Sequence, residues 1–154
     1  MATTQNSGVA PKITASPGSV CKVTGDVVTM KTGVGLCTLK AAWAANTYYL
    51  AATANQTVTA APHGTVTTIT NTIPQTTHPL KVEVYFTVSN GTTTKATGNV
   101  TVTAASGQTC TGSVASGKCL LTFTSPETSN LTATYQGNTD NSTSTSAPYR
   151  LTVN

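Results

Sequence analysis

Four cysteines are the residues of this chain whose type and spacing predict a chemistry. They fall into two local pairs, Cys21 with Cys37 and Cys110 with Cys119. Neither pair has the C-x-x-C spacing of a zinc site or a redox motif, and both histidines, His63 and His78, lie outside the cysteine regions. The sequence therefore predicts two disulfides, Cys21–Cys37 and Cys110–Cys119, and an extracellular or cell-surface location in an oxidising compartment.

The other reactive residue types do not combine into a catalytic or metal-binding pattern. Calcium needs clustered oxygen ligands, but the acidic residues are far apart in sequence, at Asp26, Glu83, Glu127 and Asp140. No G-x-S-x-G motif occurs, and the histidines stand beside Gly64 and Pro79 in loop contexts. A Lys–Asn isopeptide would need a buried lysine beside an asparagine and an acid, for which Lys81, a late asparagine and Glu83 are conceivable. We predict that the chain has no catalytic residue, no metal site and no cofactor.

The basic residues give a formal net charge of +4 but form no run, since they occur singly at Lys12, Lys22, Lys31, Lys40, Lys81, Lys95, Lys118 and Arg150. Nucleic-acid-binding proteins concentrate such residues on one face and interleave aromatic residues for stacking. No segment is long and apolar enough to span a bilayer, and residues 1–20 lack the pattern of a signal peptide. We therefore predict neither nucleic-acid binding nor membrane insertion, and we expect the chain to be a piece of a longer parent.

Composition and alternation predict an all-β protein. Only 8% of residues are charged and 38% are hydrophobic, and the abundant β-branched threonine suits the solvated face of a strand. Apolar residues alternate with threonine in three neighbouring segments between Gly98 and Gly137, namely GNVTVTAA, CLLTFT and LTATYQG. The strongest predicted strand is Leu80–Val88, which the Asn90-Gly91 turn ends. Period two over neighbouring segments predicts an antiparallel sheet with one buried face.

The first third of the chain predicts shorter strands. They cover residues 12–15, 20–23, 27–30 and 36–42 and are separated by turns that contain glycine. Residues 41–54 are rich in alanine, but Asn46, Thr47 and the paired tyrosines interrupt any helical stripe. We therefore predict no helix there, and we place Trp43 in the core because it continues the alternation of Leu39 and Ala41.

An internal repeat predicts two tandem modules. Leu39–Thr47 (LKAAWAANT) aligns without a gap with Leu131–Thr139 (LTATYQGNT), and each copy is followed by a last strand, Gln56–Ala60 or Tyr149–Val153. The predicted modules are residues 1–62 and 63–154, joined at Ala61–Gly64. The first has only five or six strands, fewer than the seven or so of an immunoglobulin-like sandwich, so one edge is left unpaired unless residues 1–10 cover it.

Several motifs of the second module resemble the bacterial immunoglobulin-like repeat of large secreted and surface proteins. They are Thr97–Val102, Gly117–Thr122 and Leu131–Asn138; Ser19–Val23 and Gly35–Leu39 of the first module are similar to related repeats. The resemblance implies two tandem immunoglobulin-like β-sandwich modules without catalytic residues. Asn138 follows Gly137 where such repeats commonly carry aspartate, a departure that weakens the case for a calcium site.

The function that follows is a non-enzymatic extracellular structural or adhesive segment, a spacer or stalk whose partners are neighbouring modules of a parent chain or assembly. One alternative is a subunit of an extracellular filament or virion surface, joined by strand addition. Another is a carbohydrate-binding module, which would require exposed aromatic residues. The candidates are Trp43, Tyr48, Tyr49, Tyr135 and Tyr149, and most fall on predicted core positions.

Overall fold

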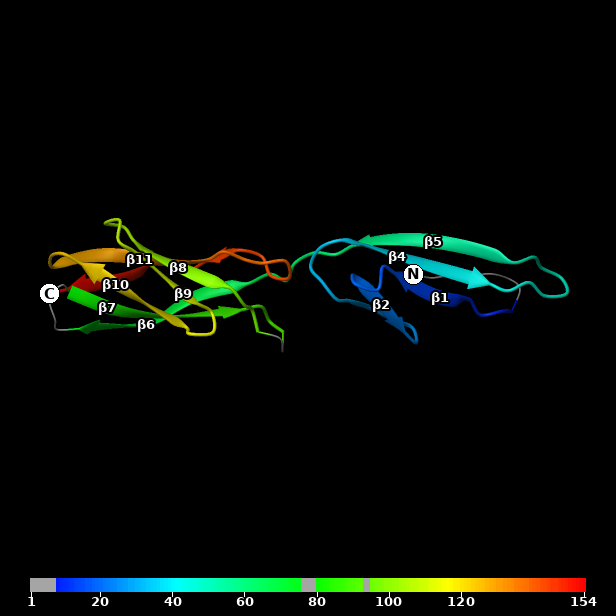
Figure 1. The fold of residues 1–154 in the computed structure, drawn as a ribbon, viewed down its shortest axis with the longest axis horizontal. Coiled ribbons are helices and arrows are strands. Elements are labelled where there is room, and N and C mark those ends of the chain that lie inside the picture. The colour runs from blue at the N-terminus through cyan, green and yellow to red at the C-terminus, as the bar shows by residue number, and fades with distance from the viewer. Residues whose placement is uncertain (1–7, 76–79, 93–94) are drawn as a thin grey trace. The chain divides into compact units, whose positions relative to one another are not determined.

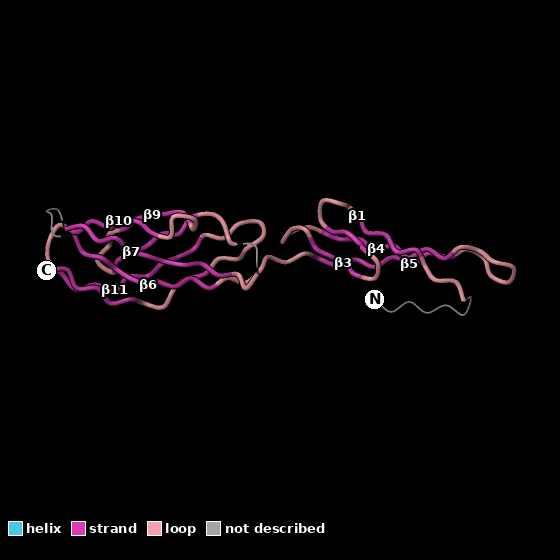
Figure 2. The backbone as a smooth tube through the Cα atoms, turned by 90° about the horizontal axis from the view of Figure 1, so that it is seen from below, coloured by secondary structure: helices cyan, strands magenta, loops and turns pink. Residues whose placement is uncertain are grey.

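The protein is described by a computed structural model that covers residues 8–75, 80–92 and 95–154. Every regular element in these ranges is a β-strand, and loops connect the strands (Figure 2). Contacts divide the chain into two compact units, the first unit Met1–Pro62 and the second unit His63–Asn154. The predicted all-β fold with two sandwich units is confirmed, and each unit is described by itself.

Two antiparallel sheets form the second unit (Figure 1). The first, here the β7 sheet, has the order β10-β7-β6 and contains β6 (Val66–Gln75), β7 (Leu80–Ser89) and β10 (Lys118–Phe123). The other, here the β11 sheet, contains β8 (Asn99–Ala104), β9 (Thr109–Ser113), β11 (Glu127–Tyr135), β12 (Ser144–Thr145) and β13 (Tyr149–Val153). In it β11 is central, with β8 and then β9 on one side and β12 and β13 on the other. This strand order is that of an immunoglobulin-like sandwich.

The core of the second unit lies between these sheets, and alternate residues of each strand supply it. The largest fully buried side chains are Tyr135, Phe123, Leu121, Leu131, Val82, Val84, Val100 and Val102. Strand β7 is buried at every second position up to Phe86, as its alternation predicted. The sequence therefore specifies which face of each strand is buried.

One expectation about this core was wrong. The three threonine-rich segments between Gly98 and Gly137 were expected in one sheet, but β10 pairs with β7 while β8 pairs with β11. Strands β9 and β10 approach each other closely at Gly112, where an added Cβ would lie 2.1 Å from the carbonyl oxygen of Lys118. Because Gly112 has no side chain, these two strands, which belong to different sheets, can approach each other this closely.

The first unit has a three-stranded sheet and a separate hairpin. The sheet has the order β1-β4-β5, from β1 (Lys12–Ser16), β4 (Leu36–Trp43) and β5 (Ala52–Thr59); the hairpin pairs β2 (Cys21–Thr24) with β3 (Val27–Met30). Its hydrophobic cluster consists of Cys21, Cys37 and Leu39, against which Ala15, Val20, Val23 and Met30 pack. Trp43 is buried, as predicted, and residues 41–54 contain no helix. The question of whether residues 3–9 pair with an edge falls mostly outside the described residues.

Both predicted disulfides are present. Cys21 of β2 is joined to Cys37 of β4, and Cys110 of β9 is joined to Cys119 of β10, each with a Cα–Cα distance of 5.8 Å. Each bond links the two layers of its own unit. Structural disulfides persist in oxidising compartments, so they indicate a non-cytoplasmic environment. Within the described residues, no helix is long and apolar enough to cross a membrane.

Candidate functional site

The chain enters and leaves the second unit at opposite ends of β11. At one end, the backbone N–H of His63 donates to the Asp140 carbonyl at 2.8 Å, and the N–H of Ser142 donates to the His63 carbonyl at 2.9 Å. These contacts lie just beyond Tyr135, the last residue of β11. At the other end, Val153 pairs with Glu127, the first residue of β11. A strand of nine residues is about 30 Å long, so the two ends are separated by the length of the sandwich.

The first unit has the same polarity. Lys12 pairs with Ala42 near the end of β4, whereas Thr59 pairs with Leu36 at its start, and the N–H of Ala60 donates to the Gly35 carbonyl at 2.9 Å. Ala60 is hydrogen-bonded within the first unit and His63 within the second, and only Ala61 and Pro62 lie between them in the sequence. In both units the chain therefore enters at the C-terminal end of the central strand and leaves at its N-terminal end.

The side chain of Asn138 forms hydrogen bonds that stabilise the loop to which His63 is bonded. Its Nδ2 donates to the carbonyl of Thr97 at 2.9 Å and to the Thr97 hydroxyl at 3.1 Å. Its Oδ1 accepts from the backbone N–H groups of Asp140 and Asn141, both at 2.9 Å. Buried Tyr135 donates its hydroxyl to the same Thr97 carbonyl at 2.7 Å, and burial raises the pKa of Tyr135. Asn138 thus has a structural role that requires an amide.

We expect Asn138→Asp to destabilise the second unit by about 1–2 kcal/mol, since it removes both Nδ2 donors and places a carboxylate against the Thr97 carbonyl. Urea unfolding followed by far-UV circular dichroism measures the change. Thr139→Asp is the matched control, because it adds the same charge at the next, exposed residue. Equal stability of the two variants would contradict the role assigned to the Asn138 amide.

The loop from Ala44 to Ala51 presents aromatic and apolar side chains to solvent. Tyr48 is 87% exposed, Leu50 89% and Tyr49 43%. The Asn46 Oδ1 accepts from the N–H groups of Tyr48 and Tyr49, both at 2.9 Å, and thereby turns the chain just after β4. Three of the five aromatic candidates do lie in or against a core, as expected, since Trp43 and Tyr135 are buried and Tyr149 packs against the core of the second unit. Exposed tyrosine rings can stack on apolar faces of a ligand.

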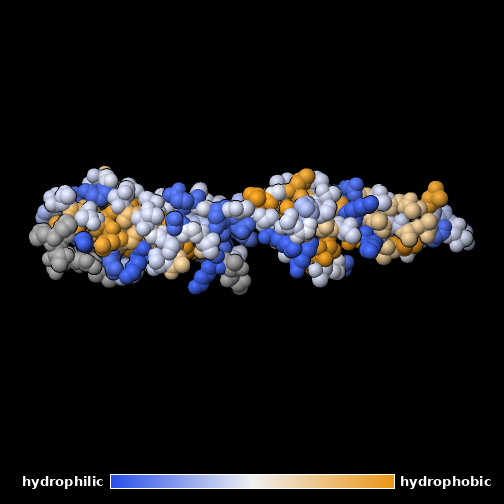
Figure 3. Space-filling view, in the orientation of Figure 1, coloured by the Kyte–Doolittle hydropathy of each residue, from blue (hydrophilic) through white to orange (hydrophobic). Residues whose placement is uncertain are grey.

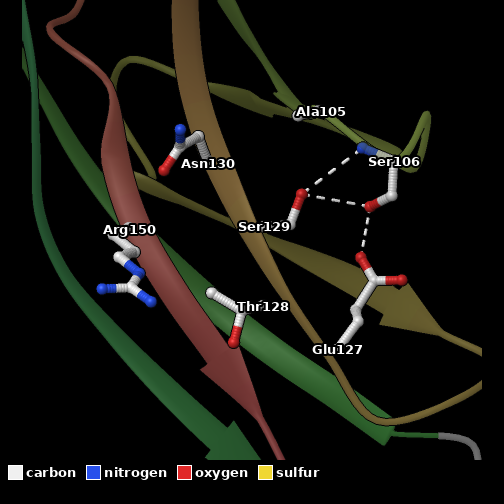
Figure 4. Close-up of a pocket in the computed structure, with 7 residues that line it drawn as sticks. All are labelled: Ala105, Ser106, Glu127, Thr128, Ser129, Asn130 and Arg150. Carbon is white, nitrogen blue, oxygen red and sulfur yellow. Dashed lines mark hydrogen bonds between the residues drawn. The ribbon is translucent and has the colours of Figure 1, made fainter.

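A shallow polar depression of about 360 Å³ lies beside β11 (Figure 4). Its lining residues are Ala105, Ser106, Glu127, Thr128, Ser129, Asn130 and Arg150. The Ser106 hydroxyl contacts the Glu127 carboxylate, and its oxygen lies 3.1 Å from that of Ser129, whereas Arg150 lies on the other side of β11. None of the lining residues is a histidine, and the Ser129 hydroxyl also accepts from the Ser106 N–H at 3.3 Å. These bonds hold the β8–β9 turn against β11.

An ion pair lies on the β7 sheet, outside the core. Lys118 Nζ is 2.9 Å from Glu83 Oε1 and 5.6 Å from the centre of the Tyr85 ring, and the Tyr85 hydroxyl donates to Glu83 Oε2 at 2.8 Å. The bond from Lys118, with a second from Tyr85, holds the pKa of Glu83 below its usual value, and the carboxylate raises the pKa of Lys118 and Tyr85. Glu83, the acid considered for an isopeptide, therefore pairs with Lys118. Lys81 is partly exposed, whereas an isopeptide needs a buried lysine.

Within the described ranges, no three His, Cys, Asp or Glu side chains are grouped so that they could hold a metal ion.

The lowered pKa of Glu83 predicts an acid-dependent loss of stability. An unfolded glutamate titrates at about 4.3, so the ion pair stabilises the second unit fully above that pH and is lost as the pH falls through the lower folded value. Between neutral and acid pH, the melting temperature of the Glu83→Gln variant should therefore fall less than that of the unaltered protein. High salt should shrink the difference between the two proteins, because it screens an exposed pair. Parallel pH profiles in low salt would contradict the assignment.

Comparisons with known proteins do not assign a family to the chain: no family model, curated protein or solved structure matches it. A functional proposal must therefore rest on the geometry of the two units. This geometry has three notable features, namely the opposite ends at which the chain enters and leaves each unit, the exposed loop 44–51, and the separate β2–β3 hairpin of the first unit.

Proposed function

We propose that this chain is a non-enzymatic structural segment of a larger extracellular or cell-surface protein, in which two immunoglobulin-like units act as a spacer or stalk. The observation that carries the proposal is that each unit receives the chain at one end of its central strand and releases it at the other. A unit with this connectivity adds the length of its sandwich to a tandem array. A unit with both ends on one side would add almost none.

Two further features support a spacer in an oxidising environment. Each disulfide cross-links the layers of its unit, and only Ala61 and Pro62 separate the residues that are hydrogen-bonded within each unit, so the connection is short. Threonine hydroxyls pair across strands of the β11 sheet, between Thr101 and Thr111, Thr134 and Thr145, and Thr128 and Thr152. These hydroxyls share the outer face of the sheet with the charged Arg150, so this face is largely polar. The immunoglobulin-like strand order and the repeated central strand favour kinship with bacterial immunoglobulin-like repeats.

The second candidate is a carbohydrate-binding module, and the exposed rings of Tyr48 and Tyr49 favour it. Stacking on sugar faces would require these rings to remain accessible. The third candidate, an assembly subunit joined by strand addition, is favoured by the hairpin of β2 and β3, which pairs with no other described strand.

Binding and activity screens on the oxidised full chain separate these candidates. The spacer proposal predicts no saturable signal on a glycan array and no turnover of ester, glycoside or peptide substrates. Saturable glycan binding that Tyr48→Ala abolishes, with Tyr149→Ala as the half-buried aromatic control, would replace the spacer by the carbohydrate-binding module. Turnover that survives repurification would overturn the non-enzymatic proposal.

A further inference from the structure

The turn that follows β7 brings a carbonyl carbon, a peptide nitrogen and two hydrogen-bond donors together at Asn90 and Gly91, the one Asn-Gly pair of the sequence. The Asn90 Oδ1 accepts from the backbone N–H of Thr92 at 3.2 Å and from the Thr92 hydroxyl at 3.0 Å. A turn of this kind folds the side-chain amide back over the next peptide group, which brings the Asn90 Cγ toward the Gly91 nitrogen. The two donors also stabilise negative charge that develops on Oδ1.

Gly91 leaves its nitrogen accessible. Its φ is 69°, and nothing lies within 4 Å of the position that a Cβ would take. Its N–H donates to the Ser89 hydroxyl oxygen at 3.4 Å, a polar group through which the proton can pass to water. Gly91 is exposed, and Figure 3 shows hydrophilic residues at the surface of the end of the second unit where β7 ends. Water therefore reaches the turn.

We propose that Asn90 is a site of self-modification, at which the Gly91 nitrogen attacks the side-chain amide and converts it to a carboxylate. The nitrogen gives up its proton and forms a bond to the Asn90 Cγ, while the Cγ–Nδ2 bond breaks and Nδ2 takes up a proton and leaves as ammonia. Water then opens the resulting succinimide ring at either of its two carbonyls. The products are aspartate and isoaspartate, and the only co-reactant is water.

The amide that is lost begins a directional chain of three side-chain amides. The Asn90 Nδ2 donates to the Asn141 Oδ1 at 2.8 Å, and the Asn141 Nδ2 donates to the Asn138 Oδ1 at 3.1 Å. The Asn138 Nδ2 donates in turn to the Thr97 carbonyl at 2.9 Å. Asn141 therefore cannot rotate its amide toward residue 90 without losing its bond to Asn138. A carboxylate at residue 90 faces the oxygen of the buried Asn141, so one acceptor is placed against another.

The modification should loosen the loop to which His63 is bonded. Asn141 lies between Asp140 and Ser142, whose backbone groups are bonded to His63. The proposed site thus makes a slow, irreversible change at the place where the chain enters the second unit. This inference does not rest on the spacer function, because it concerns only the chemistry and stability of the second unit.

Peptide mapping of the oxidised full chain, incubated at physiological temperature and mildly alkaline pH, measures the reaction. The peptide that contains Asn90 should gain about 1 Da and appear as a mixture of aspartate and isoaspartate, since –OH replaces –NH2. Asn138 and Asn141 belong to the same chain of amides but do not precede glycine, so they should keep their amides and serve as internal controls.

Two variants test the roles assigned to the turn. Gly91→Ala should slow the reaction about tenfold or more, because a side chain is strained at this φ and shields the nitrogen. The space around Gly91 is open, so the variant should fold. Thr92→Val keeps the shape of the side chain but removes the hydroxyl donor. It should slow the reaction several-fold in the folded chain and have no effect on the chain unfolded in urea.

Asn90→Asp tests the effect of the product on the loop. Amide exchange at His63 and Ser142 should become about tenfold faster than in the unaltered chain. Thr87→Asp adds the same charge at an exposed position of β7 and should leave that exchange unchanged. The proposal is overturned if Asn90 keeps its amide, if Thr92→Val reacts as fast as the unaltered folded chain, or if Asn90→Asp leaves exchange at His63 and Ser142 unchanged.

Discussion

Replacing Cys21 and Cys37 by serine should leave the first unit unfolded under conditions in which the second unit stays folded. The disulfide closes a sequence separation of 16 residues, which is worth about 3 kcal/mol in the chain-entropy model. The buried hydrophobic cluster of this unit consists of only three residues, the two cysteines and Leu39. A core of this size has little stability to lose.

The matched control replaces Cys110 and Cys119 by serine in the second unit. Their separation is 9 residues, worth about 2.5 kcal/mol, but a much larger core remains there. We expect this variant to keep two folded units, with a lower melting temperature for the second alone. Heteronuclear NMR spectra of both variants resolve the units separately. Equal losses in the two units would contradict the difference in their cores.

Phe123→Ala should destabilise the second unit by about 3–5 kcal/mol, because it leaves a cavity between the two sheets. The ring is fully buried at the end of β10, where Phe123 pairs with Leu80 of β7. This loss is comparable to the whole stability of many small domains, so the unit should unfold at moderate denaturant concentration.

Leu120→Ala is the control for that prediction. Leu120 lies on the same strand but is 44% exposed, so its truncation should cost less than about 1 kcal/mol. Equilibrium denaturation monitored by circular dichroism gives both values. A cost at Leu120 that equals the cost at Phe123 would mean that the faces of β10 are assigned the wrong way round.

Alternation and cysteine spacing were sufficient to predict much of this fold. Leu80–Val88 was expected as the strongest strand, and β7 covers Leu80–Ser89. The disulfides could be paired from sequence because each pair is local and no metal-ligand spacing competes. These features depend on neighbours along the chain, which a single sequence displays directly.

Features that depend on contacts between distant residues could not be predicted in the same way. Period two identifies the buried face of β10 but not the sheet to which it belongs. Strand β6 continues through Pro74, because β6 is an edge strand where a missing N–H is tolerated. The ion pair of Lys118 with Glu83 requires knowledge of the register between β10 and β7, which the sequence does not contain.

The candidate sites show the same division. Asn46 indicates that Tyr48 and Tyr49 lie in a turn, because an asparagine side chain often bonds to the backbone two residues ahead. This indication is weak in the sequence, because alanines surround the turn and the preceding strand alternates up to Trp43. The bonds of His63 to Asp140 and Ser142 use only the backbone atoms of His63, so the type of its side chain does not predict them. The polar cluster around Ser106 joins residues more than twenty positions apart, and no motif announces it.

Hydrogen exchange of the oxidised full chain, read residue by residue, tests most directly the central claim of two separate units with cores of different size. The account predicts slow exchange for the amides that bond β7 to β10 and β8 to β11, which lie on either side of the large core of the second unit. It predicts faster exchange for the amides that bond β4 to β1 and β5, because the core of the first unit is small. Equal protection of the two sets of amides would contradict it.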